Sequence, residues 1–172
     1  MRSHSPEDTF AKALGYLVWA WNDLHEQMGH IFSAILYGAM SDVALAAWHS
    51  HNSDASQRHM LRDAAIPALT TKPELLAAVK WLLTEADKLW DMCNNAIHSS
   101  YAVLLSEGNT SVISNPHFGN RRAEKLKDKD LIEEFERLTA RTHSLIGYCH
   151  GLFQSIVDPE NHSIPAKPKV SE

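Results

Sequence analysis

The stretch that decides the fold is FAKALGYLVWAWNDLHEQMGHIFSAI, residues 10–35. Its main apolar positions follow an unbroken 4-3-4-3 spacing: Phe10, Leu14, Leu17, Trp21, Leu24, Met28, Ile31 and Ile35. This spacing places them on one face of an α-helix, and a flanking stripe that includes His25 widens the face to that of a core helix. Because Ser5 and Pro6 suit a helix start and Gly38 suits a helix end, we predict a helix over residues 6–38.

The same spacing recurs in two more long segments. One opens with a capping box of Thr71 and Glu74 and is expected to continue to about residue 102. The other opens at Asp130 and Glu133 and ends before the Asp-Pro pair at residues 158–159. Each segment has an apolar seam that needs cover, so both are expected to be core helices.

Three long helices with shorter ones between them predict an all-α fold, an antiparallel helical bundle. A shorter helix is expected around residues 54–66, ending before a proline. After the second long helix the pattern breaks, and residues 101–105 and 112–113 suggest a short extended hairpin. Cys93 and Cys149 fall on inward seams, where a thiol acts as a small core hydrophobe.

Length and composition predict one domain. With 172 residues, we expect a single domain over residues 1–157 and a disordered C-terminal tail over residues 158–172, whose spaced prolines have nothing to bury. The net charge of −5 excludes a histone-like polycation. The longest apolar runs have six residues, too few for a membrane span, and no secretory signal fits the N-terminus. We therefore expect a cytoplasmic protein without a membrane partner.

The most informative segment is LWDMCNNAIHSSY, residues 89–101. At about 100° per residue, a narrow polar strip outside the apolar seam gathers Asp87, Asp91, Asn94, His98 and Tyr101. A solvated helix face would carry Lys, Glu and Gln, so these short hydrogen-bonding groups favour a partly buried polar site or a subunit interface. The plainer alternative is an incidental surface histidine beside polar residues.

The run NNAIHS at residues 94–99 resembles the signature of HEPN domains, in which four to six intervening residues separate an arginine, often followed by asparagine, from a histidine. The runs WNDL at residues 21–24 and QRHML at residues 57–61 are also similar to bacterial HEPN-like proteins. The resemblance covers about residues 10–155. It implies the same fold class, an all-α bundle.

Many HEPN proteins are metal-independent endoribonucleases that act as homodimers, some of them with antitoxin or defence partners. The resemblance therefore implies a homodimer that acts on RNA without a cofactor. It makes His98 the catalytic acid or base and Asn94 its polar neighbour. A histidine can move the proton of a ribose 2′-hydroxyl, while a cation stabilises charge on the phosphate.

One departure from the signature bears on catalysis. The allowed spacing places the arginine at position 91, 92 or 93, where this chain has Asp91, Met92 and Cys93. None of these is cationic. Either Arg58 or Arg62 on the neighbouring short helix is borrowed as the RNA-binding cation, or the site no longer cleaves RNA. We favour the loss or strong weakening of nuclease activity.

Further RNA contacts are expected from Tyr101 and from Arg121 and Arg122, which begin a basic run that ends at Lys129. An aromatic ring can stack on a base, and arginine pairs with phosphate. Since Glu124 interrupts the run, a solvated surface is the alternative reading.

Two other function classes stay open. A metal-binding bundle of the DinB-like kind could use His25 and His98 with Asp91, but no helix offers two well-spaced inward ligands, so we expect no metal. A non-catalytic dimeric interaction module would need no site chemistry at all.

Overall fold

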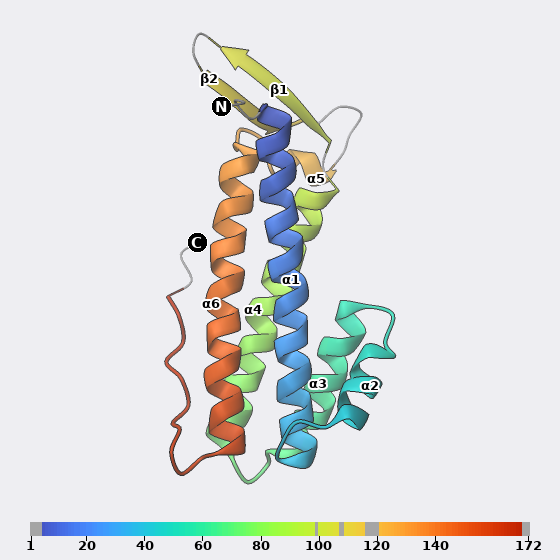
Figure 1. Ribbon diagram of the computed structural model, residues 1–172, viewed down its shortest axis with the longest axis vertical. Helices are drawn as coiled ribbons and strands as arrows, with labels where there is room; N and C mark the ends of the chain where they lie inside the picture. The colour runs from blue at the N-terminus through green and yellow to red at the C-terminus, as the bar shows by residue number, and fades with distance from the viewer. Residues whose placement is uncertain (1–4, 99, 107–108, 116–120, 170–172) are drawn as a thin grey trace. The chain divides into compact units, whose positions relative to one another are not determined.

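The computed structural model describes residues 5–98, 100–106, 109–115 and 121–169. Within these residues the chain forms six helices and one two-stranded sheet (Figure 1). The helices are α1 (Pro6–Tyr37), α2 (Asp42–His49), α3 (Asp54–Ala68), α4 (Pro73–Ile97), α5 (Arg121–Glu124) and α6 (Leu131–Val157). The strands are β1 (Tyr101–Ser106) and β2 (Asn109–Ser114). The predicted all-α fold with a short hairpin is confirmed.

The chain divides into two compact units. Unit 1 comprises Met1–Trp21 and Lys88–Thr142, and unit 2 comprises Asn22–Asp87 and His143–Glu172. Each of the three long helices, α1, α4 and α6, contributes one segment to each unit. Within a unit these segments lie side by side, and the α4 segment runs opposite to the other two (Figure 1).

Unit 1 has an aromatic centre beneath the hairpin. The ring of Phe10 on α1 lies 4.4 Å from that of Tyr101 on β1 and 5.3 Å from that of Phe135 on α6. The two strands pair antiparallel, with Tyr101 opposite Ser114. The Ser114 hydroxyl donates to the carbonyl of Ala123 at 2.8 Å, which holds α5 against β2.

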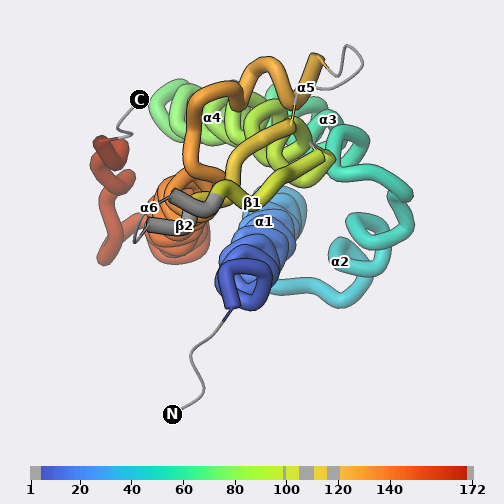
Figure 2. The backbone as a smooth tube through the Cα atoms, turned by 90° about the horizontal axis from the view of Figure 1, so that it is seen from above, coloured from blue at the N-terminus to red at the C-terminus, as the bar shows by residue number. Residues whose placement is uncertain are grey.

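Unit 2 adds α2 and α3 beside its segment of α1 (Figure 2). Trp48 of α2 is fully buried, and its indole lies so close to Gly29 of α1 that a Cβ there would approach it to 2.9 Å. The ring of Phe32 lies 5.8 Å from the same indole. A glycine on α1 thus provides the space in which α2 docks.

Local signals set several helix ends as predicted. The Ser5 hydroxyl accepts from the Asp8 amide at 3.2 Å, and Gly38 ends α1 with φ of 72°. At the start of α6, Asp130 accepts from the amides of Ile132 and Glu133. Cys93 and Cys149 are buried, as the seams predicted.

Two helix ends differ from the prediction. The second long helix, α4, ends at Ile97 rather than near residue 102, because Ser100 pairs with Asn115, the residue after β2. The Asn115 amide donates to the Ser100 carbonyl at 2.8 Å, and the Ser100 hydroxyl donates to the Asn115 carbonyl at 2.6 Å. Helix α3 continues through Pro67 to Ala68. A proline so close to the end of a helix disturbs the hydrogen bonding of the last turn only. The expected loop before α6 also contains the short helix α5.

The C-terminal segment also differs from the expected disordered tail. Residues 158–169 leave α6 and fold back along it within unit 2. The hydroxyl of Ser155 donates to the carbonyl of Ser163 at 2.7 Å, and Pro165 packs on Gly151. The prolines therefore do have a surface to bury against, which no local pattern showed.

No helix among the described residues is long and apolar enough to cross a membrane.

Candidate functional site

His98 lies in the turn that ends α4, in unit 1. Its side chain is exposed, and its amide donates to the carbonyl of Asn94 at 3.2 Å. Asn94, one turn earlier, is partly buried. His98 is therefore exposed at the C-terminal end of α4, one helical turn after the Asn94 that the sequence predicted as its neighbour.

Tyr101 belongs to β1 and not to the helix face on which the angular reading placed it. One face of its ring lies against Phe10, while 48% of the residue remains exposed. An aromatic ring that packs on a neighbouring ring and is still half exposed is suited to stacking on a planar group.

Arg121 and Arg122 are both exposed and begin α5. Their neighbour Ala123 is bound through its carbonyl to Ser114, which pairs with Tyr101 across the sheet. The hairpin thus connects the two arginines to the strand that carries Tyr101. Unit 1 therefore contains Asn94 and four more of the predicted site residues, namely His98, Tyr101, Arg121 and Arg122.

Arg58 and Arg62 lie in unit 2, where a carboxylate binds both. Arg58 is 2% exposed, and its Nε donates to Asp87 Oδ1 at 2.7 Å. The Nη2 of Arg62 donates to Asp87 Oδ2 at 3.0 Å. The burial of Arg58 makes it a structural residue of the α3–α4 contact, which does not fit the predicted role as an RNA-binding cation.

The three positions that would hold the motif arginine carry no cation. Asp91 is exposed, Met92 is partly buried and Cys93 is buried. Burial raises the pKa of the Cys93 thiol to about 12, although Arg141 acts in the opposite direction. The thiol is therefore protonated at neutral pH and is a poor nucleophile.

Sequence reasoning missed a charged cluster at the start of α6. The carboxylate of Glu134 is buried and accepts hydrogen bonds from Arg137 at 2.9 Å and from Lys129 at 3.2 Å. Burial alone would raise the pKa of Glu134, but these two donors outweigh it and hold the pKa below its ordinary value. The i,i+3 spacing of Glu134 and Arg137 was the only signal for this pair.

The cluster accounts for the side chains around position 92. The Nη2 atom of Arg137 lies 3.8 Å from Met92 Sδ, and the Nη1 atom of Arg141 lies 4.0 Å from it. Two guanidinium groups from α6 thus face α4 within unit 1, whereas the sequence analysis had considered only Arg58 and Arg62 as cations for the site. Both groups contact the thioether of Met92. At about 100° per residue, Met92 lies about 120° around the axis of α4 from His98, so the two guanidinium groups are on a different side of the helix.

The DinB-like alternative depended on His25, which is buried in unit 2. Its Nε2 lies 3.0 Å from Arg58 Nη1, and since a guanidinium can only donate, this nitrogen is an acceptor already engaged by Arg58. Within the described residues, no group of three or more His, Cys, Asp and Glu side chains is placed to hold a metal ion.

Comparisons with family models, with curated proteins and with solved structures found no significant match to this chain. The HEPN-like assignment therefore remains a hypothesis carried by the sequence motif.

Proposed function

We propose that this chain is a HEPN-like RNA-binding protein that has lost the arginine needed for cleavage. The observation that carries the proposal is the exposed His98 beside Asn94 at the end of α4, in the same unit as exposed Tyr101, Arg121 and Arg122. These side chains supply what single-stranded RNA requires. The aromatic ring stacks on a base, the guanidinium groups pair with phosphates, and the imidazole hydrogen-bonds to phosphate or ribose.

Binding without turnover follows from the residue at motif position 91 and from the burial of Arg58. Transfer of the 2′-hydroxyl proton needs an acid or base, which His98 supplies, and the developing phosphate charge needs a cation. Asp91 occupies one of the three motif positions with the wrong charge, and Arg58 is buried against Asp87. A protein of this kind acts on RNA in the cytoplasm, as a regulator rather than as a nuclease.

The dimer expected for this family fits the apolar groups that unit 1 leaves in solvent. Trp90 and Ile97 on α4 are exposed, as is Tyr101. A two-fold axis beside the end of α4 would cover these groups and bring two copies of His98 together.

Fluorescence anisotropy with a labelled single-stranded RNA tests the binding function. The double variant Arg121→Ala/Arg122→Ala should bind more weakly, and its salt dependence should flatten by about 0.7 in log–log slope for each phosphate that the variant no longer neutralises. The matched control is Lys80→Ala, which removes an exposed cation from unit 2 and should leave the slope unchanged. Equal effects of the two changes, or no binding at low salt, would refute the proposal.

Variants of Tyr101 provide a second test of RNA binding, one that does not depend on charge. Tyr101→Ala should weaken binding by about tenfold, because base stacking on an aromatic side chain contributes about 1–3 kcal/mol. Tyr101→Phe keeps the ring against Phe10 and should restore the affinity.

The same RNA tests the loss of cleavage. It should remain intact during prolonged incubation with the wild-type protein. Metal-independent cleavage that disappears in His98→Ala would instead identify an active nuclease and contradict the degenerate assignment.

A further inference from the structure

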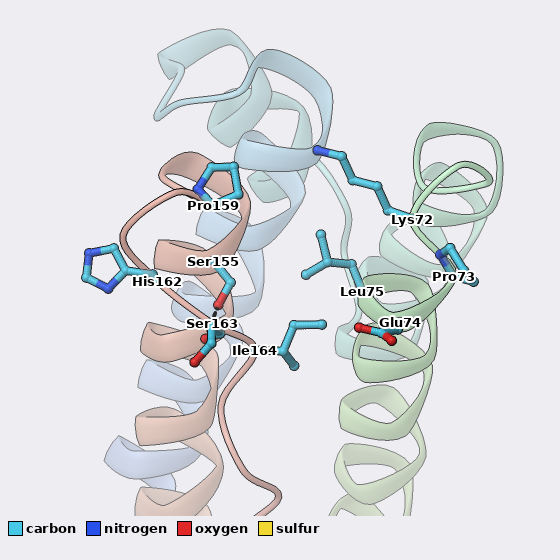
Figure 3. Close-up of a pocket in the computed structure, with 9 residues that line it drawn as sticks. All are labelled: Lys72, Pro73, Glu74, Leu75, Ser155, Pro159, His162, Ser163 and Ile164. Carbon is cyan, nitrogen blue, oxygen red and sulfur yellow. Dashed lines mark hydrogen bonds between the residues drawn. The ribbon is translucent and has the colours of Figure 1, made fainter.

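The C-terminal segment of unit 2 is held as a docked peptide. Beyond the turn that closes α6, the Ser163 carbonyl accepts from Ser155 at 2.7 Å (Figure 3). Ser155 is itself buried, and its hydroxyl also lies 2.8 Å from the carbonyl oxygen of Gly151 on α6, so its single proton is shared between the helix and the segment. Residues 163–168, which belong to no helix or strand, then run back beside α6 (Figure 1).

Gly151, one turn before Ser155, is shaped for a proline. A Cβ at Gly151 would lie 2.9 Å from Cβ and 3.1 Å from Cγ of Pro165, closer than carbon atoms approach one another. Only glycine therefore lets the Pro165 ring lie against the backbone of α6. Gly147, one turn earlier on the same helix, has no such neighbour within 4 Å.

The next contact is between a cation and an aromatic pair. The Nζ of Lys167 lies 5.6 Å from the ring centre of Trp81 on α4. That ring meets Tyr148 of α6 edge-on, with centroids 4.7 Å apart. Lysine over an indole face is the geometry of a cation–π interaction.

The segment has the composition of a known kind of ligand. Its sequence, SIPAKPK at residues 163–169, contains the P-x-x-P spacing of Pro165 and Pro168 with basic residues beside it. Proline-rich segments are extended before they bind, so they lose little conformational entropy on aromatic surfaces. The surface of Trp81, Tyr148, Gly151 and Ser155, here called the tail groove, offers aromatic rings, a recess for a proline and a hydroxyl donor.

The segment does not fill all of the space beside it. An open cleft of about 670 Å³ lies between it and the start of α4. Figure 3 shows Ile164 reaching across this cleft toward Leu75 and Glu74. Of the residues of the tail groove, only Ser155 also lines this cleft, so the cleft adjoins the groove at its Ser155 end.

We propose that the tail groove is a binding site for extended, basic, proline-containing peptides, and that the chain's own C-terminal segment is its resident occupant. A partner protein that carries such a segment displaces the tail and takes its place. The proposal is independent of the RNA-binding function, because it uses only unit 2.

Hydrogen–deuterium exchange on the full chain tests how the tail is held. Gly151→Ala should accelerate exchange of the Asn161 and His162 amides, which donate to the Asp158 carbonyl, because the added methyl displaces Pro165 and releases the turn that precedes it. Gly147→Ala makes the same chemical change on the same helix where there is open space, and should leave the exchange unchanged. Equal rates in the two variants would contradict docking through Gly151.

Binding of an added peptide tests the groove itself. The probe is a labelled peptide with the sequence of residues 160–169, and the protein is full-length Pro165→Asp, whose own tail can no longer fill the recess. We expect saturable binding at least tenfold tighter than to the wild-type chain, in which the tail competes. Adding Gly151→Ala should abolish this binding, and adding Gly147→Ala should preserve it. Failure of Pro165→Asp to bind the peptide, or binding that survives Gly151→Ala, would overturn the proposal.

Discussion

Arg58 joins three helices of unit 2 through its guanidinium group. It donates to Asp87 on α4 and to His25 on α1, and it is almost fully buried. Arg58→Ala should therefore lower the free energy of unfolding by about 2–3 kcal/mol, because removal of one partner leaves buried polar groups unpaired. Arg62→Ala is the matched control: it removes the other donor to Asp87, but from a side chain that is 34% exposed, and should cost less than about 1 kcal/mol. Urea denaturation measures both, and equal losses would contradict the structural role assigned to Arg58.

Cys93 makes stability depend on alkaline pH. Its pKa in the folded chain is about 12, above that of an exposed thiol, so between about pH 9 and 12 the unfolded chain releases a proton that the native chain keeps. The stabilising contribution is complete below about pH 9 and is lost as the pH rises. The free energy of unfolding should fall less steeply over pH 9–11 in Cys93→Ala than in the wild type, and identical slopes would show that the thiol titrates alike in both states.

At the scale of one element, the start of α6 is set by a single carboxylate. Asp130 accepts from the amides of Ile132 at 2.8 Å and Glu133 at 3.2 Å, which would otherwise lack helical partners. Asp130→Ala should lower the free energy of unfolding by about 1 kcal/mol, whereas Asp130→Asn keeps an oxygen acceptor and most of the stability. Thermal unfolding followed by circular dichroism compares the two, and an equal loss in both would locate the effect in charge rather than in capping.

At the scale of the whole molecule, the proposed dimer predicts a mass of two chains by light scattering at tens of micromolar. Ile97→Glu places a charge among the exposed apolar groups at the end of α4 and should shift the mass toward one chain. Val43→Glu, which changes a still more exposed aliphatic residue in unit 2, should leave the mass unchanged. A wild-type mass of one chain would contradict the dimer.

Several features of the candidate site could be predicted from the sequence because they depend on neighbours in the chain. The helix that carries Asn94 follows from the 4-3 spacing of its seam, and burial of Cys93 follows from its place on that seam. The position of Tyr101 could not be predicted in the same way. The helical pattern extended past it, but hydrogen bonds between Ser100 and Asn115 form a hairpin there instead.

The sequence by itself determined the long helices, the capped starts of α1 and α6 and the faces that the helices bury, because hydrophobic period and capping act over three or four residues. Only the tertiary structure decided that Arg58 pairs with Asp87, 29 residues away, and that the C-terminal segment docks on Gly151. Such contacts join side chains that no period relates, and each depends on space or charge supplied by another element. From the sequence alone, a glycine at residue 151 only destabilises the helix. The structure shows why it is there, because a Cβ at this position would collide with Pro165.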